Sequence, residues 1–374
     1  MKNKELPLLI SGTGESLNDI QHLTGFRAVS RVVLLKLENG EQHLVVPQAE
    51  YGRALKNARS SFVWTPEMLS VSSKNRNDIR KWISAMLAEK KIRQVHVMAD
   101  FPHAYAMAII KCGVSLDVIS HSIVSSRSLK NPNEIRRISD SQQAAVIAMR
   151  SAISLIQRSK IDSDNTLKLG NHHLTAEYLR KFIARILVDH DCDGAGSIVA
   201  CGQQTEAPHE QGYGVLKAYE PILMDIFPRH MTHGYWGDIT RTVVKGRPSL
   251  ELRRMYNAVR AAHDAAISTI KAGIQAKSVH KAVISEFKAR GYETEMRDGL
   301  LTGVISCTGH GVGLSLHEDP IVGSDPVKLS CGNVLAIEPG LCYPGIGAVR
   351  IEDLVEVTSD GCKYIVPCER KFEL

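Results

Sequence analysis

The chain has 374 residues, of which 44% are hydrophobic and 23% charged, and its formal net charge is +6. This length favours about two domains, and the composition is that of an ordinary soluble globular protein. No apolar run approaches the ~20 residues of a transmembrane helix, and the first residues lack a signal-peptide core. The eight cysteines include no Cys-x-x-Cys pair. They therefore predict reduced thiols in a cytoplasmic protein, with neither a disulfide framework nor a zinc cluster.

The positive charge is concentrated in residues 1–150, which hold 21 Lys and Arg against 13 Asp and Glu, whereas the rest of the chain holds 25 against 27. A basic region can bind nucleic acid, but these charges follow polar helical stretches such as 74–81 without interleaved aromatic residues. We therefore expect a solvated basic face, with no nucleic-acid or membrane partner.

The first part of the chain predicts a mixed α/β domain. Two strand-like runs, 31–37 and 43–46, flank Asn39-Gly40, a pair typical of a tight hairpin turn. The run 95–99 predicts a buried strand, and a helix is expected to follow it, opening at 100–102 and ending near Ile110.

A change of pattern near 128–133 predicts the domain boundary. The segment is polar, and Pro132 stands just before a long helical stretch from about Glu134 to Ile156. We therefore expect an N-terminal domain of residues 1–130 and a second domain of residues 131–374.

The second part predicts long helices with recognisable ends. One helix is expected over 249–272, stopped by Gly273, and another over 278–290, with Ser278 as its N-cap and Gly291 beyond its end. The polar stretch 158–173 fits neither helix nor core and predicts a surface excursion.

Two acidic pairs at nearly equal spacing carry most of the functional information. Asp225 and Asp238 are 13 residues apart, and Glu338 and Glu352 are 14 apart. In each pair an apolar run leads into the first acid, and a strand-like run after a turn carries the second, which predicts two β-hairpins. The matching offsets predict an internal two-fold repeat with both hairpins at one central site. Four carboxylates in an apolar setting repel one another unless a cation lies between them, so we expect a metal.

A fifth candidate ligand is His310, within the run 308–318, where glycines on both sides of it allow a close approach to a crowded centre. Oxygen-rich ligands with one imidazole suit Mn²⁺, Co²⁺ or Fe²⁺ better than structural zinc. Five side chains fit a two-metal centre, which is equipment for amide hydrolysis.

At these residues the chain resembles the creatinase/methionine-aminopeptidase ("pita-bread") metallopeptidases, and within them the Xaa-Pro aminopeptidase and prolidase branch. The resemblance rests on four ordered motifs and extends more weakly to 16–20 and 23–26. The motifs are Gly234-Tyr235-Trp236-Gly237-Asp238-Ile239-Thr240-Arg241-Thr242, Thr308-Gly309-His310-Gly311, Ile337-Glu338-Pro339-Gly340 and Val349-Arg350-Ile351-Glu352-Asp353. It implies an α+β chain: a C-terminal pita-bread fold, in which helices cover a pseudo-two-fold β-sheet, and a smaller α/β creatinase-type N-terminal domain.

The resemblance also implies the site and its reaction. Two divalent ions, Mn²⁺ first and Co²⁺, Fe²⁺ or Zn²⁺ as alternatives, would be held by Asp225, Asp238, His310, Glu338 and Glu352. A metal-bridging hydroxide would attack the scissile carbonyl, with Glu338 passing its proton to the leaving proline nitrogen. His209 would contact substrate, His317 would stabilise the tetrahedral intermediate, and Arg350 would support the bound acids or the substrate carboxylate. The substrate would be a peptide with proline second, and the protein a homodimer or homotetramer.

In one feature the chain departs from the family pattern. Family members usually hold the two aspartates eleven residues apart, so the turn here is two residues longer, and this bears on Asp225 most directly. An even insertion preserves the face on which a strand residue lies. His230 and His233 in this turn resemble ligands but are expected to be solvated.

Several alternatives remain open at this point. The favoured function is Xaa-Pro aminopeptidase, with Xaa-Pro dipeptidase, a metal-free creatinase-like C–N hydrolase and a non-catalytic binding protein as the alternatives. His209 and His317 could be structural histidines, and Arg350 only an ion-pair partner. The acids could also pair with arginines, as Asp238 could with Arg241.

Overall fold

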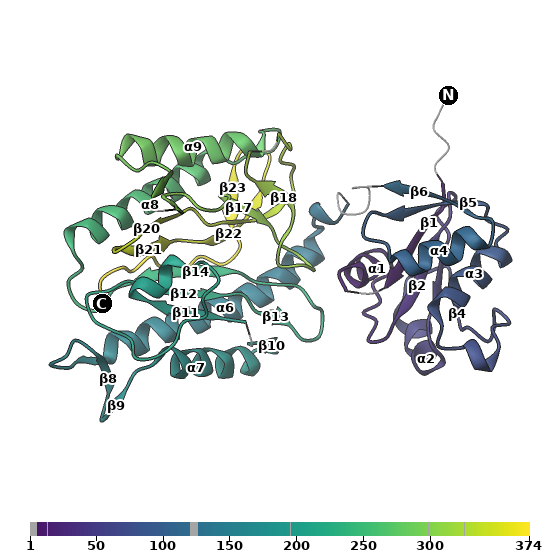
Figure 1. Ribbon diagram of the computed structural model, residues 1–374, viewed down its shortest axis with the longest axis horizontal. Coiled ribbons are helices and arrows are strands. Elements are labelled where there is room, and N and C mark those ends of the chain that lie inside the picture. The colour runs from purple at the N-terminus through teal and green to yellow at the C-terminus, as the bar shows by residue number, and fades with distance from the viewer. Residues whose placement is uncertain (1–5, 13, 120–125, 195, 298, 325) are drawn as a thin grey trace. The chain divides into compact units, whose positions relative to one another are not determined.

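The computed structural model describes residues 6–12, 14–119, 126–194, 196–297, 299–324 and 326–374. Residues 1–5, for which the sequence predicts no signal-peptide core, lie outside these ranges. The chain divides into two compact units, Met1–Arg127 and Ser128–Leu374 (Figure 1). No helix within the described ranges is both long enough and apolar enough to cross a membrane.

The first unit is built on a six-stranded mixed sheet in the order β4-β3-β2-β1-β5-β6. β2 pairs antiparallel with β1 and β3, and the other pairings are parallel. Its elements are β1 (Leu8–Gly12), α1 (Ser16–Thr24), β2 (Val32–Lys36), β3 (Gln42–Val45), α2 (Gln48–Asn57), β4 (Phe62–Trp64), the 3₁₀ helix η1 (Ser73–Asn75), α3 (Ile79–Glu89), β5 (Gln94–Met98), α4 (His103–Lys111) and β6 (Ser115–Ile119).

Side-chain alternation along β2 explains why helices lie on both faces of this sheet. Val33 and Leu35 belong to a core cluster with α3 and α4, whereas Val32 and Leu34 belong to the cluster with α1 and α2. Successive strand residues point to opposite faces, so a fully apolar strand needs a cover on each. The predicted hairpin turning at Gly40 is confirmed, as are the strand β5 and the helix α4.

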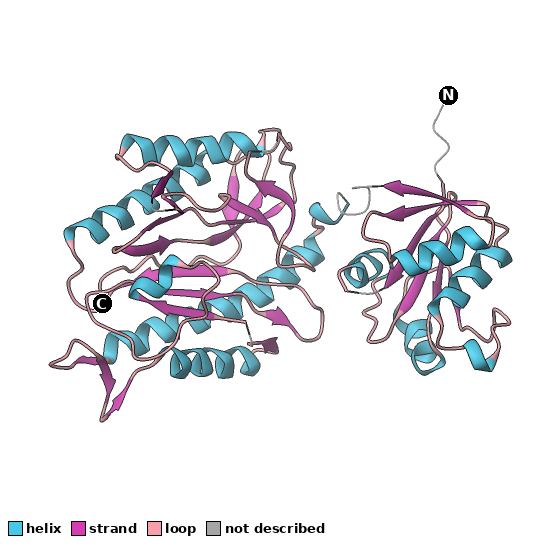
Figure 2. Ribbon diagram, viewed as in Figure 1, coloured by secondary structure: helices cyan, strands magenta, loops and turns pink. Residues whose placement is uncertain are grey.

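The second unit contains two helix pairs with β-strands between them (Figure 2). The helices are α6 (Pro132–Arg158), α7 (Ala176–Asp189), α8 (Leu250–Thr269), α9 (Ala276–Ala289) and the 3₁₀ helix η2 (Gly202–Glu206). The strands are β7 (Lys160–Ile161), β8 (Leu167–Leu169), β9 (His172–His173), β10 (Cys192–Asp193), β11 (Ile198–Cys201), β12 (Ile222–Ile226), β13 (Arg229–His230), β14 (Ile239–Val243), β15 (Glu295–Arg297), β16 (Leu300–Thr302), β17 (Gly309–Gly311), β18 (Glu318–Val322), β19 (Val334–Ile337), β20 (Gly340–Tyr343), β21 (Gly347–Arg350), β22 (Asp353–Val357) and β23 (Cys362–Tyr364).

The unit is organised as two related halves. One core cluster joins α6 and α7 to the sheet β11-β12-β14, and a second joins α8 and α9 to strands of the sheet β18-β17-β19-β22-β23. Each half therefore has a helix pair over a sheet that carries one of the acidic hairpins.

Helix ends follow the sequence signals only in part. Asn131 and Glu134 form a capping box at the start of α6, and Ser249 caps α8. The predicted end of α8 at 272 is wrong, because the helix stops at Thr269 and the N–H of Ala272 bonds to the Thr358 carbonyl of another segment.

The start predicted for the following helix is also wrong. The N–H of Ala276 bonds to Val327, Gln275 is the N-cap of α9, and Ser278 lies inside the helix. The end is as predicted, since Gly291, with φ of 81°, follows the helix.

The stretch 158–173 is more ordered than a surface excursion. It contains the small sheet β7-β8-β9, and Leu167 of β8 is fully buried in the core of the first half. Its N–H also bonds to the Leu216 carbonyl. Ile161 and Leu169 also pack against this core, so three apolar side chains anchor an otherwise polar segment.

The two acidic hairpins differ in register. Asp225 stands opposite Thr240, so Asp238 lies two residues nearer the hairpin tip but on the same face. In the other hairpin Ile337 pairs with Asp353 and Gly340 with Arg350, a register that places Glu338 and Glu352 opposite each other. The two halves therefore share a helix-pair-and-sheet arrangement, but the two acidic pairs have different registers within their hairpins.

Gly237 allows the first hairpin to approach α6, and substitution by alanine tests this contact. A Cβ at Gly237 would lie 2.7 Å from the Ser141 carbonyl carbon and 2.8 Å from the Gln142 nitrogen, both backbone atoms that cannot move aside. We expect Gly237→Ala to lower the free energy of unfolding by about 1–3 kcal/mol in urea titrations. Gly361→Ala, where a Cβ meets no atom within 4 Å, is the control. Equal midpoints for the two variants would contradict the close approach.

Candidate metal centre

Strands from both halves bring the five predicted ligands together. Asp225 is in β12 and Asp238 directly precedes β14, while His310 is in β17, and Glu338 and Glu352 flank β19 and β22. One ligand atom each of Asp238, His310 and Glu352 lies within 4.8 Å of the other two, and all three residues are buried. Three chain segments distant in sequence therefore meet at one point.

The remaining two acids adjoin this trio. Nε2 of His310 lies 3.7 Å from Oδ2 of Asp238 and 3.5 Å from Oε1 of Glu338. Arg350 joins Asp225, with Nη2 2.5 Å from its Oδ2, and its Nε lies 3.9 Å from Oε2 of Glu338. The structure thus gathers every predicted ligand in one cluster.

The orientation of His310 suits a cation. Its Nδ1 lies 3.1 Å from the Gly311 carbonyl oxygen, which can only accept a hydrogen bond. Nδ1 therefore carries the proton, and the lone pair of Nε2 faces the carboxylates. A Cβ on Gly309 or Gly311 would overlap the neighbouring carbonyl oxygens of Ala336 or Asp319, so β17 fits its place only with glycine at these positions.

Burial and mutual repulsion govern the charges of the cluster. Burial, followed by the charges of Glu352, Asp225 and Glu338, raises the pKa of Asp238 well above its ordinary value. Burial and the charges of Glu338 and Asp225 likewise raise the pKa of Glu352. Burial also raises the pKa of Glu338, against the opposing charge of Arg350. A single guanidinium does not balance four carboxylates, and the site favours added positive charge.

Arg350 keeps its own charge in this setting. Burial alone would lower its pKa, but the carboxylates, Asp225 and Glu338 foremost, raise it above the ordinary arginine value. Arg350 is therefore a permanent cation within the cluster.

One carboxylate oxygen in the cluster lacks a partner that a cation could supply. Oδ1 of Asp225 is buried and has no hydrogen-bond partner among the described residues, although Oδ2 of the same side chain bonds to Arg350. Buried carboxylate oxygens are normally satisfied. Oxygen donors with one imidazole fit a divalent cation, so the residues present suit a metal.

Two polar residues that sequence analysis missed hold the ligands in place. Thr240 donates from Oγ1 to Oε2 of Glu352 at 2.7 Å and accepts from Nε of Arg350 at 3.2 Å. Gln142 of α6 pairs with the backbone of Asp238, with bonds of 2.9 and 2.7 Å. Thr240 could have been found from the two-residue period of β14, since it shares a face with Asp238. Gln142 has no such signal, because 96 residues separate it from its partner.

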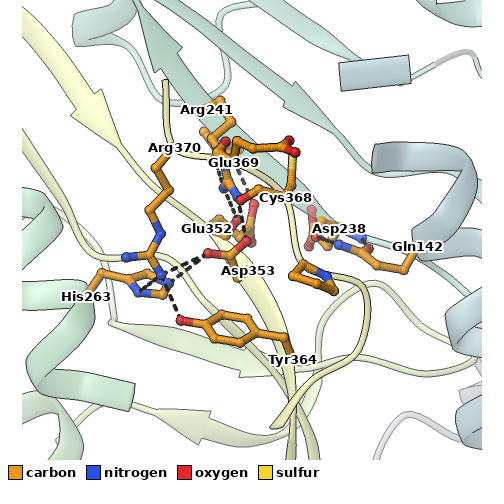
Figure 3. Close-up of polar contacts among 12 residues, drawn as sticks. Gln142, Asp238, Arg241, His263, Glu352, Asp353, Tyr364, Cys368, Glu369 and Arg370 are labelled. Carbon is orange, nitrogen blue, oxygen red and sulfur yellow. Dashed lines mark hydrogen bonds and ion pairs between the residues drawn. The ribbon is translucent and has the colours of Figure 1, made fainter. Parts of the chain in front are cut away.

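Arg241 is also part of this support, but not in the way the sequence suggested. It does not pair with Asp238; its Nη2 lies 2.6 Å from Oδ1 of Asp353, and its Nη1 bonds to the Glu352 carbonyl at 2.6 Å (Figure 3). Arg370 approaches the other oxygen of Asp353 at 3.3 Å. Two arginines therefore fix the residue next to a candidate ligand.

The other predicted residues lie around the cluster. The ring of His317 stands edge-on to that of His310, with centroids 4.4 Å apart. His209 lies on the exposed loop after η2, close enough for its charge to act on Glu338 and His317. His230 and His233 stack 3.7 Å apart and are half-buried, so the expectation that they are solvated is wrong. Nδ1 of each accepts a backbone N–H of the turn itself, from Thr232 and Tyr235 respectively.

Comparison with known proteins identifies the family. The model of metallopeptidase family M24 matches residues 136–359, more than half of the chain. The chain belongs to this family. It is 28% identical over 335 residues to a Pyrococcus horikoshii protein named Xaa-Pro dipeptidase, covering 86% of this chain and 88% of that one.

Solved structures confirm the predicted fold. The prolidase from Pyrococcus furiosus superposes with a TM-score of 0.81 at 23% identity, over 99% of this chain and 98% of that one. The X-Pro aminopeptidase from Thermotoga maritima gives 0.80 at 20% identity, over 99% and 97%. The M24 chain thus has the α+β architecture expected, with a pita-bread second unit, and its family and its buried donor cluster indicate a divalent-metal site.

Loss of the Thr240 hydroxyl should weaken metal binding. Thr240→Val keeps the side-chain shape but removes the donor to Glu352, and partners that orient metal ligands typically contribute about 10- to 100-fold in affinity. Competition with a fluorescent chelator measures the change. Thr240→Ser, which retains the hydroxyl, is the matched control, and equal affinities of the Val and Ser variants would contradict this role.

The raised carboxyl pKa values predict how the stability of the metal-free protein depends on pH. In the folded state Asp238, Glu338 and Glu352 bind protons more tightly than in the unfolded chain. The free energy of unfolding should therefore fall as pH rises from the ordinary range of acids through these raised values. Urea titrations of chelator-treated protein at several pH values measure it. Asp238→Asn should flatten the dependence, and a stability that rises with pH in the metal-free protein would refute the expectation.

Proposed function

We propose that this protein is a metallo-exopeptidase that hydrolyses Xaa-Pro peptide bonds, with Xaa-Pro dipeptides as its preferred substrates. The observation that carries the proposal is the convergence of Asp225, Asp238, His310, Glu338 and Glu352 in a buried cluster with excess negative charge. Membership of a metallopeptidase family supports the same reading.

The preference for dipeptides differs from the sequence-based expectation, which favoured an aminopeptidase. The Pyrococcus horikoshii relative, matched over most of both chains, is named Xaa-Pro dipeptidase. The aminopeptidase from Thermotoga maritima is similar in fold at only 20% identity. These similarities therefore favour Xaa-Pro dipeptides over longer peptides as the preferred substrates.

We assign the five side chains as ligands of two divalent ions, with Mn²⁺ first. Four carboxylates and one imidazole form an oxygen-rich donor set of the kind that manganese accepts. When bound, such ions lower the pKa of a water molecule and polarise the scissile carbonyl. We also propose a homodimer or homotetramer in the cytoplasm, where the eight free thiols would stay reduced.

Glu338 is the residue best placed to move a proton. The side chain of Glu338 is 15% exposed, whereas that of Asp238 is 5% exposed. Glu338 is half-buried, whereas Glu352 is buried. Burial raises the pKa of Glu338, which brings a carboxyl group nearer to the range in which it can both accept and release protons at neutral pH. Glu338 would take a proton from water and deliver it to the leaving proline nitrogen.

The surroundings of Glu338 would position the substrate. The charges of His317 and His209 act on Glu338, and the ring of His317 stands edge-on to that of His310. These two imidazoles would contact the carbonyl oxygen or carboxylate of a short peptide. An apolar pocket adjoins Arg350 and is lined in part by Ile198, Ala200 and Leu223, which suits an apolar side chain of the substrate.

Activity assays test the proposal directly. Purified protein loaded with Mn²⁺ should cleave Xaa-Pro dipeptides faster than Xaa-Pro-Yaa tripeptides, and neither Xaa-Ala peptides nor creatine should be hydrolysed. Glu338→Gln should lower kcat by about 10²- to 10⁴-fold, the usual contribution of a general acid–base group. Glu356→Gln on β22, whose carboxylate pairs with Lys363 instead, is the control. Metal-loaded protein that cleaves neither peptide class would refute the function, and faster tripeptide cleavage would restore the aminopeptidase assignment.

A further inference from the structure

A buried ion pair adjoins the loop that carries His317 and has no part in the chemistry assigned above. Nζ of Lys130 lies 2.5 Å from Oε1 of Glu318, and the two side chains are only 1% and 4% exposed. Lys130 precedes α6 by two residues, whereas Glu318 opens β18 directly after His317. Two buried charges are costly to desolvate, so the pair calls for a reason beyond stability.

The loop folds around the carboxylate of Glu318. The N–H of Ser315 points to Oε2 of Glu318 at 3.4 Å, and a Cβ on Gly313 would overlap the same carboxylate. The N–H of Gly313 also bonds to the Ser315 carbonyl. The carboxylate therefore occupies the inside of the turn 313–318, and the position of Glu318 determines the path of the chain to His317.

Lys130 is itself held firmly. Its N–H bonds to the Gly332 carbonyl, and its Nζ also lies 3.4 Å from the Ser128 carbonyl oxygen. The Ser128 carbonyl accepts a further bond from Nδ2 of Asn333. The ammonium is thus a fixed point to which the loop is attached, not a mobile counterion.

A second attachment comes from the hairpin that carries Asp238. Trp236 donates its backbone N–H to the Gly313 carbonyl at 2.9 Å and its indole Nε1–H to the Leu314 carbonyl at 3.1 Å. The loop is therefore attached on one side to Trp236, two residues before the candidate ligand Asp238, and on the other side, through Glu318, to Lys130.

We propose that Lys130 is a positioning residue: through Glu318 it fixes the 313–318 loop and so holds the His317 imidazole against the metal centre. The inference rests on the proposed function for the consequence, because His317 would act on an Xaa-Pro substrate. Its structural part, a loop ordered by the ion pair, does not depend on the substrate.

Hydrogen exchange tests the structural part. In Lys130→Met the amides of 313–318 should exchange faster than in the wild type, while those of α6 keep their protection. Lys130→Met leaves the Glu318 carboxylate without its ammonium partner, and the double variant Lys130→Met/Glu318→Met removes this carboxylate as well. The double variant should be thermally more stable than Lys130→Met, since buried ion pairs tolerate apolar replacement. Its 313–318 amides should still exchange faster than those of the wild type. Leu187→Ala, a fully buried residue of α7, is the control that lowers stability without this effect. Unchanged exchange at 313–318 in both Lys130 variants would overturn the proposal.

A double-mutant cycle tests the link to His317. With an Xaa-Pro dipeptide, Lys130→Met should lower kcat/KM by about 100-fold, the effect of misplacing a group by about 1 Å, with metal content unchanged. In the His317→Ala background, Lys130→Met should lower kcat/KM only slightly further, because the imidazole that Lys130 positions is absent. Fully additive losses would overturn the link. The two proposals can fail separately. If the wild type cleaves no Xaa-Pro peptide, the proposed function is refuted. If Lys130→Met nevertheless accelerates exchange at 313–318, the role of Lys130 in positioning the loop still holds.

Discussion

The repulsion among four buried carboxylates is the constraint on which the second unit depends. Asp225, Asp238, Glu338 and Glu352 are brought together with one guanidinium, that of Arg350, in a setting that raises the pKa of three of them. A chain free to relax would separate such charges. They stay together because each is attached to a strand that the hydrophobic cores of both halves hold in place. The repulsion among the carboxylates lowers the free energy of unfolding, and a divalent cation that binds the folded state would raise it.

The alternation of β14 shows how one strand serves both halves. Thr240 faces the site and donates to Glu352, and Thr242 exchanges hydrogen bonds with the backbone of Arg350. Arg241 points the other way and binds the Glu352 carbonyl and the Asp353 carboxylate. Successive strand residues lie on opposite faces. Residues 240–242 therefore bond to the hairpin that carries Glu338 and Glu352 from both faces of β14. Hydrogen bonds from the protein itself therefore hold the candidate ligand Glu352 in place.

Sequence analysis could predict whatever is encoded locally. From short-range rules it predicted the turn at Gly40 and the acids at the ends of apolar runs, and from the resemblance of four motifs it expected the fold. It could not predict the end of α8 or the start of α9, because distant carbonyls decide where their backbone N–H groups bond. The Lys130–Glu318 pair spans 188 residues, so no local pattern reveals it. The alternative in which Asp238 pairs with Arg241 does not hold, because residues 238 and 241 lie on opposite faces of the strand and the Arg241 side chain reaches Asp353 instead.

The lengthened turn after Asp225 shows what an even insertion can add. The register that pairs Asp225 with Thr240 continues to the bridge between Arg229 and Trp236 and to the bond from His230 to Tyr235, so the extra residues extend the hairpin without shifting it. An odd number would have turned one aspartate away from the other. Within this hairpin, Trp236 donates hydrogen bonds to the carbonyls of Gly313 and Leu314. The two-residue insertion thus leaves Asp225 in the cluster, while the two bonds from Trp236 connect the segment that leads to Asp238 with the loop that leads to His317.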